Sequence, residues 1–352
     1  MTDDAHDETT SPAGIDLEVL GAWMDDHGLG SGPVEGVEHL AGGTQNIIVR
    51  FRRGHDVFVL RRPPVHKRAN SDETMRREAR VLAALAGSAV PHPTLIASEG
   101  DPEVLGAAFT IMESVDGFNP TTGLPAPHAG DPAMRHRIGL SLIEAAAALG
   151  AVDHVAVGLE DLGRPDGFIE RQVPRWRAQL DAYAELPGYP GHTIDGVDEV
   201  ARWLAQNQPT DSRPGIMHGD FHLANVLIHR DRGEIAAVVD WELCTIGDPL
   251  LDLGWVLATW RDDHGGMTTT SVTPWEGFAT SAELIEHYRR CSERDLTAWP
   301  WFATLACYKL GIILEGTHAR ACAGLAPRAT GDVLGAMAVA LFARANRFIA
   351  AT

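Results

Sequence analysis

The sequence predicts an α+β protein of two lobes, in which a β-rich N-terminal part precedes a mainly helical C-terminal part. Short apolar runs separated by turn residues crowd the first third of the chain, whereas helical spacing of apolar residues dominates the rest. Hydrophobic residues make up 45% of the 352 residues, enough for two packed cores. We expect a disordered tail over residues 1–14, an N-terminal lobe over 15–115 and a C-terminal lobe over 116–352.

Capping and turn residues define the elements of the N-terminal lobe. Asp16 is placed to cap a helix that runs to about His27, and Ser71 to cap a second helix that runs to Ala86. Runs of β-forming residues bounded by glycine, proline or aspartate predict strands at 34–41, 47–52, 57–62, 95–98 and 108–113.

One face of the second helix carries an unexpected charge. Spacings of three and four place four residues on this face, namely Met75, Glu78, Leu82 and Leu85. A carboxylate on a face that packs against a sheet is costly unless it is paired. Strand alternation makes Arg61 the nearest candidate partner, with Arg62 the alternative if the register shifts by one. We therefore expect an Arg61–Glu78 ion pair.

The C-terminal lobe is predicted to be helical around one short β-hairpin. Asp131 followed by Pro132 is typical of a helix start. Asp252 is expected to open a further buried helix and to brace the loop before the hairpin. The other expected elements are helices at 132–150, 197–206, 281–292 and 300–321 and the hairpin at 226–239.

Charge and cysteine content exclude some classes of function. The formal net charge of −19 disfavours a nucleic-acid or anionic-membrane partner, since either requires a basic surface. The start of the chain is polar, and no 18 consecutive residues are apolar, so we expect neither a signal peptide nor a membrane span. Four cysteines without a C-x-x-C pair predict reduced thiols in the cytoplasm. The oligomeric state is unknown from sequence.

The segment His218–Asn225, HGDFHLAN, precedes the hairpin and carries its most informative residues. If the hairpin turn centres between Arg232 and Gly233, Asn225 lies opposite Asp240, with Cβ atoms about 4.5–5.5 Å apart. Carboxylate and amide oxygens of this kind suit Mg²⁺. Asp220, in the loop that enters the same end of the hairpin, is left to act as a base.

HGDFHLAN followed by Val239-Asp240-Trp241-Glu242 resembles the catalytic loop and metal-binding aspartate of aminoglycoside phosphotransferases and choline-kinase-like enzymes. The resemblance implies a two-lobed protein-kinase-like fold and transfer of the γ-phosphate of ATP to a hydroxyl group of a small molecule. It implies that Asp220 is the catalytic base, that His218 orients the loop, and that Asn225 and Asp240 hold Mg²⁺.

The same resemblance assigns nucleotide-binding roles in the N-terminal lobe. It implies that a glycine-rich loop covers the phosphates, that a cation on the third strand reaches them, and that the backbone between the lobes binds adenine. Arginine stands where lysine is usual, and its forked guanidinium can still bind phosphate. The residues so assigned are Gly43, Thr44, Asn46, Arg61, Glu78, Glu113 and Val115. Whether the nucleotide is ATP or GTP stays open.

Two further segments narrow the resemblance to a subgroup. Val59–Pro64, VLRRPP, and the later Pro91-His92-Pro93 resemble kinase-like domains that are fused to acyl-CoA dehydrogenases. Neither segment identifies the acceptor. The pocket for it would be built from the helical lobe, where the loop 260–278 and the pair Glu315 and His318 are candidates.

Two other classes of function remain open at this point. His218, Asp220 and His222 form an H-x-D-x-H string that a zinc hydrolase could use. That interpretation leaves Asn225 and Asp240 unexplained. Arg61 in place of lysine is also compatible with a pseudokinase that binds nucleotide without turning it over.

Overall fold

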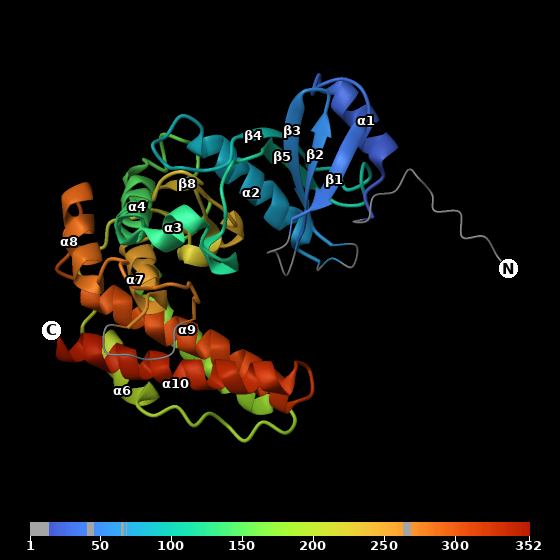
Figure 1. Ribbon diagram of the computed structural model, residues 1–352. Helices are drawn as coiled ribbons and strands as arrows, with labels where there is room; N and C mark the ends of the chain where they lie inside the picture. The colour runs from blue at the N-terminus through green and yellow to red at the C-terminus, as the bar shows by residue number, and fades with distance from the viewer. Residues whose placement is uncertain (1–13, 41–45, 65–66, 68, 263–268) are drawn as a thin grey trace. The chain divides into compact units, whose positions relative to one another are not determined.

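The structure is a computed structural model that describes residues 14–40, 46–64, 67, 69–262 and 269–352. These residues form two compact units (Figure 1). A sheet dominates the first unit and helices the second, which confirms the α+β class. Of the expected tail, only Gly14 lies within the described residues. The first unit contains the residues up to Ser88, His92–Asp116 and Val239–Glu242, and the second contains Ala89–Pro91, Gly117–Val238 and Leu243–Thr352.

The first unit is built on a five-stranded antiparallel sheet with the strand order β1-β2-β3-β5-β4. Its strands match the predicted ones to within two residues at each end. They are β1 (Val34–His39), β2 (Ile47–Arg53), β3 (Asp56–Arg62), β4 (Leu95–Glu99) and β5 (Phe109–Glu113).

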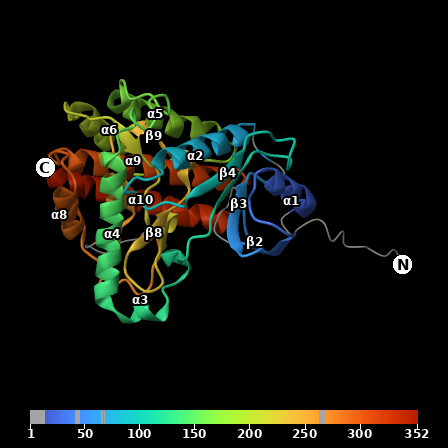
Figure 2. The same cartoon turned by 90° about the horizontal axis from the view of Figure 1, so that it is seen from above.

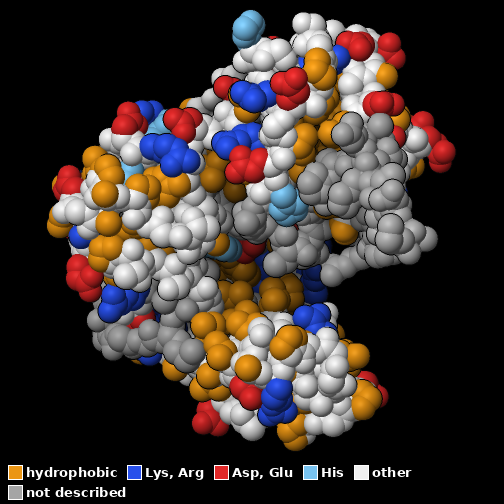
Figure 3. Space-filling view, turned by 45° about the vertical axis from the view of Figure 1, so that its right-hand side comes forward, with side chains coloured by type: hydrophobic (Ala, Val, Ile, Leu, Met, Phe, Trp, Pro, Cys, Tyr) orange, Lys and Arg blue, Asp and Glu red, His pale blue; other side chains and the backbone are white. Residues whose placement is uncertain are grey.

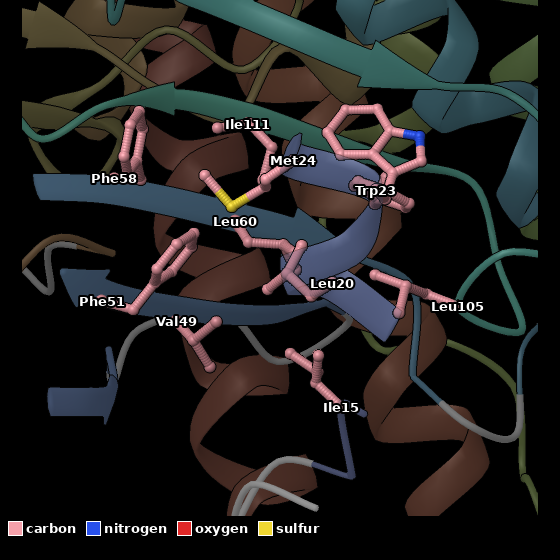
Figure 4. Packing of buried hydrophobic residues seen from close by; sticks show 11 residues of the cluster. Ile15, Leu20, Trp23, Met24, Val49, Phe51, Phe58, Leu60, Leu105 and Ile111 are labelled. Carbon is pink, nitrogen blue, oxygen red and sulfur yellow. The ribbon is translucent and has the colours of Figure 1, made fainter. Parts of the chain in front are cut away.

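Helix α1 (Leu17–Asp26) covers one face of this sheet. The carboxylate of Asp16 accepts hydrogen bonds from the backbone N–H groups of Glu18 and Val19, as its predicted role as a cap requires. Figure 4 shows the side chains of α1 packed onto β2 and β3. The buried set includes Leu20, Trp23, Met24, Val49, Phe51, Phe58 and Leu60.

Helix α2 (Ser71–Leu85) packs against β4 and β5. All four residues of the face that was singled out in the sequence are buried. The predicted cap at Ser71 is wrong, because Ser71 is already the first helical residue and Asn70, which precedes it, makes no side-chain cap. Asp72 in the first turn instead accepts the backbone N–H of Ala108, which ties the helix to the residue that leads into β5.

The second unit is mainly helical, with α4 and α6 to α9 at or near their predicted positions (Figure 2). The helices are α3 (Ala126–Gly130), α4 (Pro132–Ala151), α5 (Phe168–Ala182), α6 (Val197–Gln206), α7 (Leu250–Thr259), α8 (Ser281–Cys291), α9 (Trp299–Cys322) and α10 (Arg328–Ala350). The sequence did not predict α3, α5 or α10. Short length conceals α3, and an internal Pro174 obscures α5.

Helices α9 and α10 lie side by side in both views (Figures 1 and 2). Glycines form their contact: a Cβ added at Gly331 would lie 2.2 Å from the Cβ of Ala321, and one at Gly335 2.7 Å from Nδ1 of His318. We did not predict α10, although its length and apolar composition were an available signal. By length and composition α10 is the one described helix that could cross a membrane, a property that buried helices of other proteins share.

Two small antiparallel sheets frame the segment His218–Asn225. One pairs β6 (Gly215–Met217) with β9 (Thr245–Gly247), and the other pairs β7 (Val226–Ile228) with β8 (Ile235–Val238).

The predicted register of the β7–β8 hairpin is wrong by one residue. Val226 pairs with Val238 rather than Val239, so the expected opposition of Asn225 and Asp240 is not part of the ladder. The turn centres one residue earlier than assumed, because the N–H of His229 donates to the carbonyl of Glu234. A bulge between Leu227 and Ile228 then shifts the remaining pairs.

Candidate functional site

The loop from β6 to β7 is held in an unusual backbone conformation. Gly219 has a φ of 85°, and a Cβ added there would lie 2.6 Å from the carbonyl oxygen of Leu243. The buried Nδ1 of His218 accepts the backbone N–H of Asp220, which fits the orienting role expected of this histidine. The loop therefore requires glycine at position 219.

Replacement of Gly219 by alanine is expected to lower the free energy of unfolding by about 2 kcal/mol or more, from left-handed strain plus the contact with Leu243. Urea denaturation measures this change. Gly324→Ala is the matched control, since Gly324 has a φ of 75° and nothing within 4 Å of its added Cβ. Equal losses in the two variants would show that the contact with Leu243 contributes nothing.

Asp252 braces this loop from α7. Its carboxylate accepts the backbone N–H of His218 at 2.6 Å and that of Gly219 at 2.9 Å. Burial raises the pKa of Asp252 to about 7, against the lowering effect of these two N–H groups. The bracing role predicted from sequence is thus present, but Asp252 does not open its helix, which begins at Leu250.

The carboxylate of Asp220 is fixed on both oxygens. The indole N–H of Trp255 donates to Oδ1 at 2.8 Å, and Nε2 of His222 lies 3.1 Å from the same oxygen. The amide of Asn225 donates to Oδ2 at 2.9 Å. Burial acts to raise the pKa of Asp220, but the contacts with His222, the charge of His218 and the Trp255 hydrogen bond outweigh it and hold this pKa well below its usual range. Asp220 is therefore ionised and has one orientation.

The contacts of Asn225 also determine which way its amide points. Its Nδ2 donates to both the backbone carbonyl and the carboxylate of Asp220, two groups that can only accept. The amide oxygen of Asn225 therefore points away from Asp220. Such an oxygen is a ligand that Mg²⁺ accepts.

A second charged cluster, within the first unit, contains the predicted ion pair. Nε of Arg61 lies 3.1 Å from Oε2 of Glu78, and both side chains are buried, which confirms the pairing inferred from the face of α2. Arg62, the alternative partner, donates instead to the carbonyl of Leu105.

Arg61 also contacts two carboxylates that follow β8. Its Nη2 lies 2.7 Å from Oδ1 of Asp240 and 3.9 Å from Oε2 of Glu242. Burial raises the pKa of Glu78 to about 7, and the charges of Asp240 and Glu242 add to this rise against the lowering effect of Arg61. Three carboxylates thus surround one guanidinium, and the cluster has an excess of negative charge.

Asp240 is further marked by its backbone. Its φ of 67° is the only positive value found for a described residue other than glycine. Aspartate tolerates this conformation, but at a cost that structures sustain mainly at functional sites. The ion pair with Arg61 holds the residue in place.

Each unit offers donors of the kind that Mg²⁺ prefers. In the first unit these are the carboxylates of Asp240 and Glu242, and in the second the oriented amide oxygen of Asn225. No group of three or more His, Cys, Asp or Glu side chains among the described residues could by itself hold a metal ion. The zinc-site interpretation of His218, Asp220 and His222 has no support in this geometry.

The other predicted nucleotide residues are only partly described. Gly43 and Thr44 lie outside the described residues, while Asn46 lies just before β2. The N–H of Glu113 donates to the carbonyl of Thr94. The N–H of Val115, by contrast, has no hydrogen-bond partner among the described residues.

Sequence reasoning missed two residues beside Asp220. Trp255 lies three residues after Asp252 on α7, so both face the loop, and this spacing was an available signal. Lys309 on α9 donates to the carbonyl of Gly219 at 3.4 Å, and its ammonium lies 4.5 Å from the centre of the Trp255 ring. Burial lowers the pKa of Lys309 to about 8, although Asp220 and Asp252 act to raise it. The residues around Lys309 in the sequence do not predict its contact with the loop.

Comparisons with known proteins identify relatives by sequence and by fold. The chain is 33% identical over 297 residues to acyl-CoA dehydrogenase family member 11 of Gallus gallus and 31% identical over 323 residues to that of Rattus norvegicus. These matches cover 81% and 87% of the chain but 36% and 40% of the relatives. The chain thus spans about two fifths of the length of its curated relatives, and the predicted likeness to this subgroup is confirmed.

Solved structures extend the likeness to the whole fold. A candidate aminoglycoside phosphotransferase of Ralstonia eutropha JMP134 is 29% identical and has a TM-score of 0.78, with 95% of this chain and 99% of that chain covered. Aminoglycoside 2'-phosphotransferase-IIIa, at 16% identity, has a TM-score of 0.63 over 93% of this chain and 98% of that chain, and shares the fold. The model of the phosphotransferase enzyme family matches residues 36–299. The chain therefore belongs to the phosphotransferase enzyme family.

Proposed function

We propose that this protein is an ATP-dependent small-molecule kinase that transfers the γ-phosphate to a hydroxyl group. One observation carries the proposal: in a phosphotransferase chain, the carboxylate of Asp220 is ionised and held on both oxygens at the end of a braced loop. A carboxylate in this state can orient an attacking hydroxyl and accept its proton as the new bond forms.

Positioning is the main task of the protein in this chemistry. Phosphoryl transfer requires alignment of the hydroxyl with the γ-phosphate and stabilisation of charge, with little covalent participation by side chains. Asp220 serves as the base, and His218 keeps its loop in shape. Asn225 and Asp240 would hold Mg²⁺, which when bound neutralises charge on the phosphates.

The nucleotide would be held by the first unit. Arg61, fixed by Glu78, supplies the cation that binds the phosphates, and the N–H of Val115 supplies a hydrogen-bond donor for the adenine ring. Solved relatives of this fold have been crystallised with GDP and with ADP, so competition between ATP and GTP is part of the test. We propose cytoplasmic action on a small acceptor.

The metal role of Asp240 has a direct test in nucleotide binding. Asp240→Ala should weaken ATP binding in the presence of Mg²⁺ by about tenfold or more, because a charged ligand contributes more than 1 kcal/mol. Binding of metal-free ATP should change less. Calorimetry with and without Mg²⁺ measures both values.

Asp231→Ala is the matched control, since Asp231 is exposed at the hairpin turn. Equal losses for Asp240→Ala with and without Mg²⁺ would remove the metal assignment and leave Asp240 as a partner of Arg61 alone.

A further inference from the structure

A cleft of about 740 Å³ lies in the second unit, close in the fold to the catalytic loop. One wall is α5 and the residues before it, and another is β9, which pairs with β6 immediately before His218. Phe168 in the wall also packs near Met217 of β6, because a Cβ added at Gly247 would meet both side chains. The lining includes Arg164, Phe168, Arg171, Pro174, Arg175 and Ile246.

The charge of this cleft is opposite to that of the chain. Three arginines line it against one glutamate, Glu170. None of the three forms an ion pair with a carboxylate of any residue that the structure describes. Arg171 donates to the backbone carbonyls of Arg164 and Asp166, which leaves its charge uncompensated. In a chain of net charge −19, the cleft keeps a local excess of positive charge.

Aromatic rings link the cleft to the catalytic carboxylate. The guanidinium of Arg175 lies 5.4 Å from the ring centre of Trp176, and the ammonium of Lys309 lies 5.6 Å from the same ring. Lys309 also stacks on Trp255, which holds Asp220. The buried indole N–H of Trp176 has no hydrogen-bond partner among the described residues. Contacts between cations and aromatic rings thus form a continuous path from Arg175 in the cleft to Asp220.

We infer that the acceptor is an alcohol that also carries an anionic group, a phosphate or a carboxylate, which binds Arg164 and Arg175 in this cleft. The inference rests on the proposed kinase function. The planar guanidinium matches both oxyanions through paired hydrogen bonds. The arginines of the cleft would repel a polycationic acceptor.

The reaction balances with the groups named. The acceptor oxygen forms a bond to the γ-phosphorus of ATP while the bond from that phosphorus to the β,γ-bridging oxygen breaks. The hydroxyl proton passes to Asp220, and ADP leaves. The anionic group of the acceptor takes no part in bond changes and serves to position the hydroxyl.

Binding of inorganic pyrophosphate tests the anion site directly. With the nucleotide site saturated by a non-hydrolysable ATP analogue and Mg²⁺, pyrophosphate should bind the wild type. In Arg164→Gln/Arg175→Gln its affinity should fall about tenfold or more, because hydrogen bonds between charged groups are lost. Arg202→Gln, at an exposed position of α6, is the control and should bind like the wild type. No binding by the wild type, or equal binding by all three proteins, would overturn the inference.

Matched alcohols then test the acceptor class. Two pairs share a backbone and differ in charge: 4-hydroxybutanoate with 4-amino-1-butanol, and glycerol 3-phosphate with 3-amino-1,2-propanediol. The anionic members should have the higher kcat/KM, and the double variant should lose that preference through KM. Transfer only to the amino alcohols would overturn the inference while the kinase function stands. If the ATP analogue fails to bind the wild type, the kinase function fails, and pyrophosphate binding without it still decides the anion site.

Discussion

Asp220→Asn is expected to lower kcat by about 10²-fold or more, in keeping with the contribution of a positioned general base. The asparagine oxygen can still accept the hydrogen bond from Trp255, while its NH2 group replaces the oxygen that accepts the amide of Asn225. The brace from Asp252 to the backbone of the loop is unchanged. The asparagine cannot take the proton of the acceptor hydroxyl. ATP affinity should stay close to that of the wild type, because the loss concerns the chemical step. Steady-state kinetics and calorimetric ATP binding separate the two effects.

The control for Asp220 is another aspartate in the same unit. Asp211→Asn alters an exposed residue and should leave kcat unchanged. Turnover of Asp220→Asn near the wild-type rate, with the same acceptor, would remove the assignment of the base.

Arg61→Ala is expected to weaken ATP binding by about tenfold or more and to destabilise the first unit by about 3 kcal/mol, since the buried Glu78 loses its partner. Arg61→Lys should retain more ATP affinity than Arg61→Ala, because the charge remains while the forked contact is lost. Calorimetry at a temperature where each variant is folded measures the affinity, and urea denaturation measures the stability.

A surface ion pair provides the control for Arg61. Arg50 on β2 pairs with Glu38 on the neighbouring β1, and both side chains are exposed, where such pairs contribute at most about 1 kcal/mol. Arg50→Ala should therefore change neither property appreciably. If Arg61→Ala binds ATP as tightly as Arg50→Ala does, Arg61 does not bind the ATP phosphates, and the pseudokinase interpretation gains support.

Local chemistry explains which parts of the fold the sequence predicted. Asp16 and Asp131 cap their helices through short-range hydrogen bonds that depend on a few neighbouring residues. Glu78 was recognised because a charge on an apolar helix face requires a partner, and Arg61 is that partner. In both cases the sequence shows a polar group that must be satisfied, a helix-end N–H or a buried carboxylate, and only a few neighbouring residues can satisfy it.

The wrong or missing predictions concern features that depend on contacts between residues far apart in the sequence. The hairpin register depended on where the turn centres and on a bulge between Leu227 and Ile228, which no residue type announced. Lys309 comes about ninety residues after Gly219 and reaches it only because α9 packs in the second unit. Figure 3 shows acidic and basic side chains intermingled on one face of the protein. The grouping of three arginines in one cleft likewise depends on packing and was not predicted.

Transfer of a label from ATP radiolabelled at the γ-phosphate tests the central claim most directly. The wild-type protein, a panel of small hydroxylated molecules and Mg²⁺ are incubated together, with aminoglycosides, hydroxyacyl-CoA esters, amino alcohols and phosphorylated alcohols in the panel. We predict that label appears covalently on at least one alcohol, that EDTA abolishes the transfer, and that Asp220→Asn lowers its rate. Release of label only as inorganic phosphate, at the same rate in the wild type and in Asp220→Asn, would contradict the assignment of this protein as a kinase.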